Sequence, residues 1–184
     1  MSRQYWEELI WWATADGAAI ANTTTETIIF PDVVIPANYM ADGRVLRLTG
    51  RGRFSTTGTP TIRFRLRWGG STGTLLWDSG TITTATVTAA LWAVEMEIQT
   101  RVNGATGTLF VIGSALVGSA AAPSVGSATG APAIGMFGSA GDDTPAAVTV
   151  DLTADTALSL TAAWSAASAS NTLTGHNYFG ESLN

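Results

Sequence analysis

The chain has 184 residues, enough for one domain with a hydrophobic core, and its net charge of −5 argues against general electrostatic attraction to nucleic acid. It contains no cysteine and no lysine, which excludes disulfides, thiol nucleophiles and Schiff-base lysines, and its one histidine, His176, excludes a multi-histidine metal site within one chain. Charged residues make up 12% of the chain, against roughly 25% in ordinary domains, which suits a surface that neighbouring molecules cover in an assembly.

Residues 1–16 are predicted to form a separate N-terminal arm. Residues 7–12 are expected to make one or two helical turns, too short to be stable alone. Large aromatic side chains are costly to leave in water, so we expect the arm to dock on the parent domain or on another chain. Its expected contact residues are Tyr5, Trp6, Trp11 and Trp12.

The N-terminus does not resemble a secretory signal, because Glu7 and Glu8 fall where an apolar run is required. No window approaches the roughly 18 apolar residues that a membrane-spanning helix needs. The sequence therefore predicts a protein made in the cytoplasm, with no membrane partner.

Residues 17–184 are predicted to form a single all-β domain. Short runs rich in threonine, valine and isoleucine are separated by glycine- and proline-containing turns, a pattern typical of a sandwich or barrel. Besides a short piece at 33–35, the expected strands are residues 18–30, 44–55, 61–69, 74–83, 91–102, 108–116, 147–152, 158–164 and 172–181.

Two of these strands, 44–55 and 61–69, alternate apolar residues with arginines. Side chains of a strand point to opposite faces with period two, so one face is predicted to be apolar and the other basic. The turn at 57–60 suggests that the two strands form a hairpin within one sheet. The outward arginines are Arg47, Arg51, Arg53, Arg63, Arg65 and Arg67.

Three interpretations of the arginines are considered. They are neutralised within their own sheet, they meet acidic groups of another subunit, or they bind nucleic acid or an anionic glycan. If strand 91–102 lies beside strand 61–69, Glu95 and Glu97 pair with Arg63 and Arg65. The third interpretation is disfavoured, because no aromatic residue shares the arginine face to stack on bases.

Candidate catalytic and metal-binding residues are few. Glu95 and Glu97 are a carboxylate pair, but glycosidases use carboxylates on both sides of a sugar, usually from different strands. A set of acidic residues could bind calcium but lacks the calcium-loop motif and is interpreted as turn and strand-end residues, and His176 is expected at a surface or interface. The sequence therefore predicts no enzyme, no cofactor and no metal. The acidic set is Asp142, Asp143, Asp151 and Asp155.

Residues 117–147 form a segment dominated by glycine, alanine, serine and proline. A loop of this length is uncommon inside a compact domain. It is interpreted either as an extended arm or lid that touches a neighbour, or as a surface insertion.

The chain resembles a group of small virion proteins of tailed bacteriophages. The resemblance spans most of residues 20–182 and lies in Ala-Asn-Thr-Thr-Thr-Glu-Thr at 21–27, Ile-Pro-Ala-Asn at 35–38, residues 48–59 and Ala-Ser-Asn-Thr-Leu-Thr at 169–174. The arm and the 117–147 segment lie outside the match.

The resemblance implies a jelly-roll-like antiparallel β-sandwich and a capsid cement (decoration) protein. Such a protein, made in the host cytoplasm, would sit on the capsid surface of the virion as a homotrimer bound to the major capsid protein. One alternative is a tail or fibre component that binds a host surface glycan. The other is a glycan-active enzyme.

Overall fold

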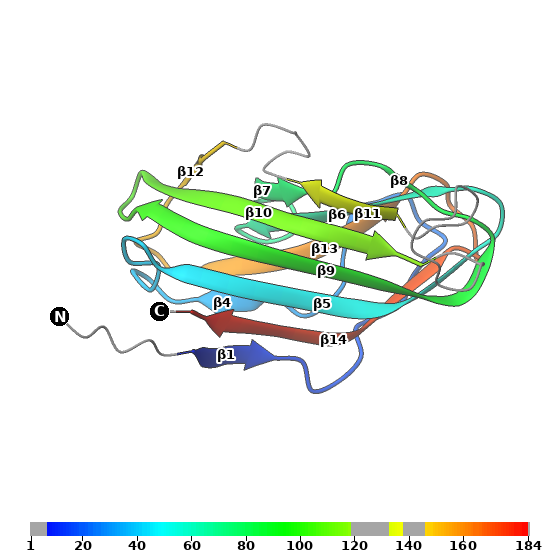
Figure 1. Ribbon diagram of the computed structural model, residues 1–184, viewed down its shortest axis with the longest axis horizontal. Coiled ribbons are helices and arrows are strands. Elements are labelled where there is room, and N and C mark those ends of the chain that lie inside the picture. Colours follow the sequence, from blue (N-terminus) through cyan, green and yellow to red (C-terminus); the bar gives the residue numbers. More distant parts are fainter. Residues whose placement is uncertain (1–6, 119–132, 138–145, 184) are drawn as a thin grey trace.

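The computed structural model describes residues 7–118, 133–137 and 146–183, and its strands form two antiparallel sheets packed as a sandwich (Figure 1). Within these residues there is no helix, and hence none long and apolar enough to cross a membrane. The predicted β-sandwich is confirmed, and the strand pairing is compatible with a jelly roll.

The larger sheet has eight strands in the order β1-β14-β5-β9-β10-β11, with β2 pairing β14 and β12 pairing β10. Its long central strands pair over most of their length, which makes one broad outer face (Figure 1). The strands are β1 (Glu8–Trp12), β2 (Ile20–Ala21), β5 (Val45–Thr56), β9 (Val87–Val102), β10 (Gly107–Val117), β11 (Ala133–Phe137), β12 (Val148–Val150) and β14 (Thr172–Ser182).

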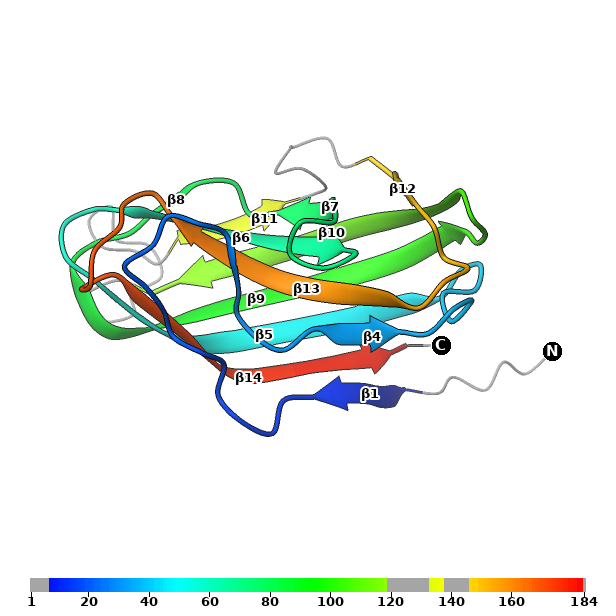
Figure 2. The same cartoon turned by 180° about the vertical axis from the view of Figure 1, so that it is seen from behind.

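The smaller sheet has six strands in the order β3-β13-β6-β7, with β4 pairing β13 and β8 pairing β6. It is the nearer layer in Figure 2. The strands are β3 (Thr27–Ile28), β4 (Val33–Ile35), β6 (Thr61–Trp68), β7 (Thr74–Asp78), β8 (Ile82–Thr83) and β13 (Thr156–Trp164).

The core lies between the two sheets and is built around Trp92 of β9. Its ring packs against Phe30 and Phe64, with centroid separations of 6.4 and 5.2 Å, and its indole N–H donates to the carbonyl of Thr174. A side chain at Gly52 of β5 would collide with that carbonyl and with the indole. Glycine at this inward position therefore lets the tryptophan lie across the sheet.

The predicted hairpin of two arginine strands is wrong. β5 pairs with β14 and β9 in the larger sheet, whereas β6 pairs with β13, β7 and β8 in the smaller one. The chain crosses between the sheets after β5, so the two apolar faces meet each other across the core. The two arginine rows consequently lie on opposite outer faces of the sandwich.

The predicted helical turns at residues 7–12 are also wrong, because this segment forms strand β1 and pairs antiparallel with β14. Only two residues at a time form strand in the predicted 18–30 segment, at β2 and β3. Within the 117–147 segment, the described residues include strand β11, which pairs with β10. The remainder of that segment lies largely outside the described residues.

Candidate functional site

The arginines of the smaller sheet are neutralised within the chain. Arg63 and Arg65 both contact the carboxylate of Asp78 on β7, with nitrogen–oxygen distances of 2.6 and 2.9 Å. Arg65 and Arg67 both contact Glu26, which precedes β3, at 2.5 Å each. Three arginines and two carboxylates thus alternate in one continuous row, and they are at most partly exposed.

Both carboxylates of this row are held in the ionised form. Burial raises the pKa of Asp78, but the hydrogen bonds from Arg63, Arg65 and the Gly80 N–H outweigh it, so the pKa lies below its ordinary value. Burial likewise opposes ionisation of Glu26, yet hydrogen bonds that include those from Arg67 and Arg65 lower its pKa to about 2. This row is therefore a structural ion network.

The predicted pairing of Glu95 and Glu97 with Arg63 and Arg65 is wrong. β9 lies beside β5, so both glutamates face Arg47 of the larger sheet. The nitrogen–oxygen distances are 3.7 Å to Glu95 and 3.2 Å to Glu97, and both carboxylates are more than half exposed. The hydrogen bond to Glu97 raises the pKa of Arg47. The two carboxylates lie side by side on one strand.

Arg51 and Arg53, on the same outer face, have no acidic partner among the described residues and are exposed. Leu91 lies beside them with 68% of its surface exposed, and Leu116 is 37% exposed. These four residues border a surface hollow of about 420 Å³. We call them the arginine–leucine patch.

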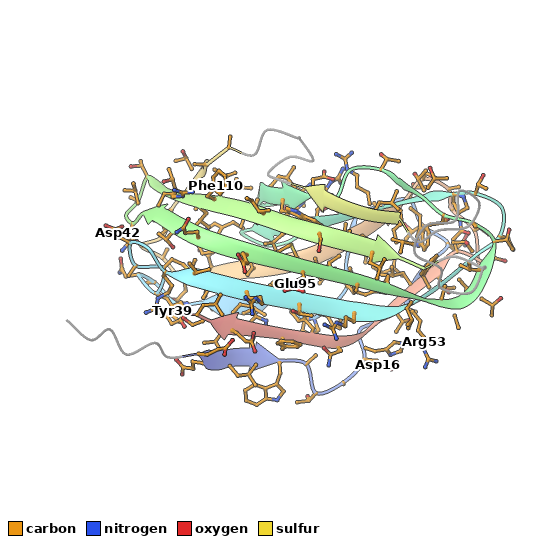
Figure 3. All side chains as sticks on the ribbon, viewed as in Figure 1. Asp16, Tyr39, Asp42, Arg53, Glu95 and Phe110 are labelled. Carbon is orange, nitrogen blue, oxygen red and sulfur yellow. The ribbon has the colours of Figure 1, made fainter. Side chains whose placement is uncertain are left out.

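His176 also lines this hollow, at a bulge in β14, and its Nδ1 lies 2.9 Å from a carboxylate oxygen of Asp16. Figure 3 shows Arg53 and Asp16 near one end of the sheet and Glu95 near its middle. The expected surface position of His176 is confirmed. Arg51 and Arg53, which lack an acidic partner in the described part of the chain, thus lie on a different part of this face from the neutralised Arg47.

The tryptophans of the arm have different environments. Trp11 is half-buried over Gly180 of β14, where a side chain would collide with the indole. Trp12 is 60% exposed. Tyr5 and Trp6 lie outside the described residues. Docking of the arm on its own sheet is therefore established for Trp11, and the predicted contact with another chain stays a prediction for the set.

The sandwich also has an open side, between strand β1 of the larger sheet and strand β4 of the smaller one (Figure 2). A groove of about 610 Å³ runs along it. Residues of β1 and the following loop form one wall, residues 31–36 form the other, and Tyr39 and Tyr178 lie between them. The aromatic content of the arm was the only sequence signal for this groove.

In the part of the chain that the structure describes, no three histidine or acidic residues come together to hold a metal ion. Asp151 accepts hydrogen bonds from Thr153, and Asp155 accepts one from the backbone N–H of Ala37. Both therefore have local structural roles. Asp142 and Asp143 lie outside the described residues.

Sequence reasoning missed Asp78 and Glu26 as the partners of the second arginine row, and it missed the leucines of the arginine–leucine patch. The signal for Leu116 was present, because residues 108–116 are nearly all apolar and only one face of a sandwich strand enters the core. Comparisons of the chain with protein-family models, curated proteins and solved structures found no match. Functional assignment therefore depends on the surfaces described above.

Proposed function

We propose that the chain is a structural protein of a tailed-bacteriophage virion, a capsid cement protein that binds the assembled lattice of the major capsid protein. The observation that carries the proposal is the arginine–leucine patch on the outer face of the larger sheet. The resemblance of residues 20–182 to small phage virion proteins supports the same assignment.

The chemistry of the patch suits a protein partner. Arginine is enriched in protein interfaces because its planar guanidinium makes two parallel hydrogen bonds to a carboxylate. Leu91 and Leu116 supply exposed apolar surface beside Arg51 and Arg53. The two arginines have no acidic partner among the described residues, so an acidic, partly apolar surface of a capsid subunit would complement this region.

A rigid sandwich suits the mechanical task of a cement protein. A head must withstand the outward pressure of its packed DNA, and a protein that binds only the assembled lattice stabilises the shell by mass action. The ion network on the smaller sheet and the tryptophan-centred core both favour a single rigid conformation. The backbone of the partner-binding face is then ordered before binding, which lowers the ordering cost.

We further propose that the protein acts as a homotrimer, as the resemblance implies. Light scattering on the purified protein at micromolar concentrations tests this directly. A trimer is expected, and a monomer across the whole range would contradict it.

The test of the main proposal compares heads with and without the protein. Particles are heated or osmotically shocked, and retained DNA is measured. We expect heads that lack the protein to release DNA at a lower temperature, and purified protein added back to restore retention. Equal retention with and without the protein would reject the cement function.

A tail or fibre component that binds a host glycan is the second candidate, favoured by the groove between β1 and β4. Copy number per virion separates the two candidates. A cement protein is present in numbers comparable to the major capsid protein, whereas a tail component is present in few copies.

A further inference from the structure

Two surface hollows adjoin on the outer face of the larger sheet and form one trough along β9. The first is the hollow of about 420 Å³ at the arginine–leucine patch, and the second, of about 230 Å³, continues it toward Glu95. The two hollows share Arg51, Ala93 and Leu116. We call them together the β9 trough. It runs from Leu91 to Glu95, which corresponds to about 14 Å of extended chain.

The register of the central strands explains why the face is hollow at this point. Ala93 pairs with Arg51 on β5 and with Leu116 on β10, so the three residues form one row across the sheet. Ala93 thus places a methyl group between two long side chains, which leaves a depression at the centre of the row. Its apolar floor and the exposed side of Leu116 suit an apolar side chain of a partner.

Rows of different chemistry lie on either side of this depression. In one row, Leu91 pairs with Arg53, and in the other, Glu95 pairs with Thr49 and Ser114. Rows two residues apart are separated by about 6.8 Å, which is also the spacing of alternate side chains in an extended peptide. An extended segment that lies along β9 therefore presents one side chain to each of the three rows.

The end of the trough that contains the arginines attracts an acidic side chain. Arg51 and Arg53 are exposed and have no acidic partner among the described residues. The carboxylate of Asp16 also lies near this end, but it contacts His176. A carboxylate that binds between the two guanidiniums forms charge-assisted hydrogen bonds, which are stronger than neutral ones.

The other end of the trough has the opposite charge. The side chain of Glu95 is 55% exposed and shares Arg47 with Glu97, so two carboxylates face one guanidinium here. Figure 3 shows Glu95 and Arg53 at separate positions along the same face. A basic side chain complements the glutamate end, just as an acidic one complements the arginine end.

We propose that the β9 trough binds one extended segment of the major capsid protein, in which an acidic, an apolar and a basic side chain occupy alternate positions. The acidic side chain bonds to Arg51 and Arg53, the apolar one fills the depression over Ala93, and the basic one lies toward Glu95. This inference rests on the proposed cement function and deepens it, because it assigns the contact to a single segment with a defined spacing of side chains.

Titration with synthetic peptides tests the trough without a capsid. The probe is the blocked heptapeptide Gly-Asp-Ser-Leu-Ser-Lys-Gly, and the backbone amide signals of isotope-labelled full-length protein report where it binds. One comparison peptide replaces its aspartate with asparagine, and a second replaces its leucine with serine. A third, Gly-Asp-Leu-Ser-Ser-Lys-Gly, has the same composition, but its acidic and apolar side chains are adjacent and point to opposite sides of an extended chain.

The probe should show saturable binding in the millimolar range, with the largest signal changes at residues 91–95 and 114–116. Each comparison peptide should bind at least tenfold more weakly. No saturable binding of the probe, or signal changes confined to other parts of the surface, would overturn the proposal. Equal binding of the third comparison peptide would also overturn it, because the spacing of the side chains would then have no role.

A substitution that fills the depression provides a second test. Ala93 is half-buried on the outer face, so Ala93→Leu should keep the melting temperature near that of the wild type while probe affinity falls at least tenfold. Gln99→Leu is the matched control, because Gln99 is half-buried on the same face of β9 and lines neither hollow. It should bind the probe normally. Normal probe binding by Ala93→Leu would contradict the assignment, and the peptide comparisons decide the matter if this variant does not fold.

Capsid shells separate failure of this inference from failure of the cement function. Ala93→Leu should bind shells at least tenfold more weakly than the wild type, and Gln99→Leu should bind them normally. If the wild type and Ala93→Leu bind shells equally well, the trough is rejected as the contact while the cement function stands. If the wild type does not bind shells, the cement function itself is rejected, whatever the peptides do.

Discussion

Each outer face of the sandwich carries a row of arginines. The two rows have the same sequence pattern but differ in their acidic partners. On the smaller sheet, Arg63, Arg65 and Arg67 share Asp78 and Glu26 in a continuous ion network. On the larger sheet, the row is divided, because Arg47 faces two glutamates while Arg51 and Arg53 are exposed beside leucines.

The difference shows that alternation of charge and apolar residues indicates which side of a strand faces out, but not what the outward charge does. Removing one partner of the neutralised row should destabilise the fold, since it would leave a partly buried charge without its counter-charge. Arg51 and Arg53 have no acidic partner among the described residues, so we expect them to contribute little to stability.

Asp78→Asn should cause the largest loss of stability. The Asp78 side chain is fully buried between Arg63 and Arg65, so removing its charge leaves both guanidiniums without a full counter-charge. We expect the free energy of unfolding to fall by about 3 kcal/mol. Chemical denaturation measures it, with Glu95→Gln as the exposed control, expected to change stability by less than about 1 kcal/mol. Equal losses of unfolding free energy for the two substitutions would contradict the proposed difference between the two faces.

Acid should weaken the smaller sheet through Glu26. Its pKa is about 2 in the folded protein, below its ordinary value of 4.5, so the unfolded chain binds the proton more tightly. The stabilisation is therefore complete above about pH 4.5 and is lost as the pH falls toward 2. We expect a loss of about 2 kcal/mol, reduced from the full pKa difference by solvent screening.

The Glu26→Gln variant checks this assignment. Its stability should already be lower at neutral pH and should change less than that of the wild type between pH 5 and about 2. An unchanged acid profile in the variant would show that Glu26 is not the responsible group.

Arg47→Gln should have a small effect on stability, although Arg47, like Arg65, alternates with apolar residues along its strand. Its two glutamate partners are 55% and 57% exposed, and exposed ion pairs contribute about 0.2–1 kcal/mol. Thermal unfolding of Arg47→Gln and Arg65→Gln side by side provides the measurement. A loss for Arg47→Gln as large as that for Arg65→Gln would contradict the division of the two faces.

The sequence predicted which face of each strand points into the core better than it predicted which strands lie side by side. In β9, the inward positions from Trp92 to Thr100 are buried as expected, and only Val102, at the end of the strand, is exposed. Period-two alternation cannot identify which strand lies alongside, so β5 and β6 were assigned to one sheet. The partners Glu26 and Asp78 were missed because tertiary structure brings them to the arginines from other strands and loops.

The candidate surfaces were predictable only in part. The arginines were recognised from their spacing, but whether each one has a partner depends on pairing between distant strands. The groove combines β1, residues 31–36 and Tyr178, which are far apart in the chain. A local pattern cannot show that these segments line one groove.

The smallest stability effect and the largest functional effect should come from the double substitution Arg51→Gln with Arg53→Gln. The control is Arg44→Gln with Arg101→Gln, which makes the same charge change where both guanidiniums lie over aromatic rings of this chain, Tyr39 and Phe110. Both proteins should fold, and the melting temperature of the first should match that of the wild type.

Binding of these two proteins to capsid shells that lack the wild-type protein tests the central claim most directly. We predict that the Arg51/Arg53 variant binds at least tenfold more weakly than the wild type, at an unchanged melting temperature, and that the control binds normally. Undiminished binding by the Arg51/Arg53 variant, or a large fall in its melting temperature, would contradict the claim that these arginines serve a partner and not the fold.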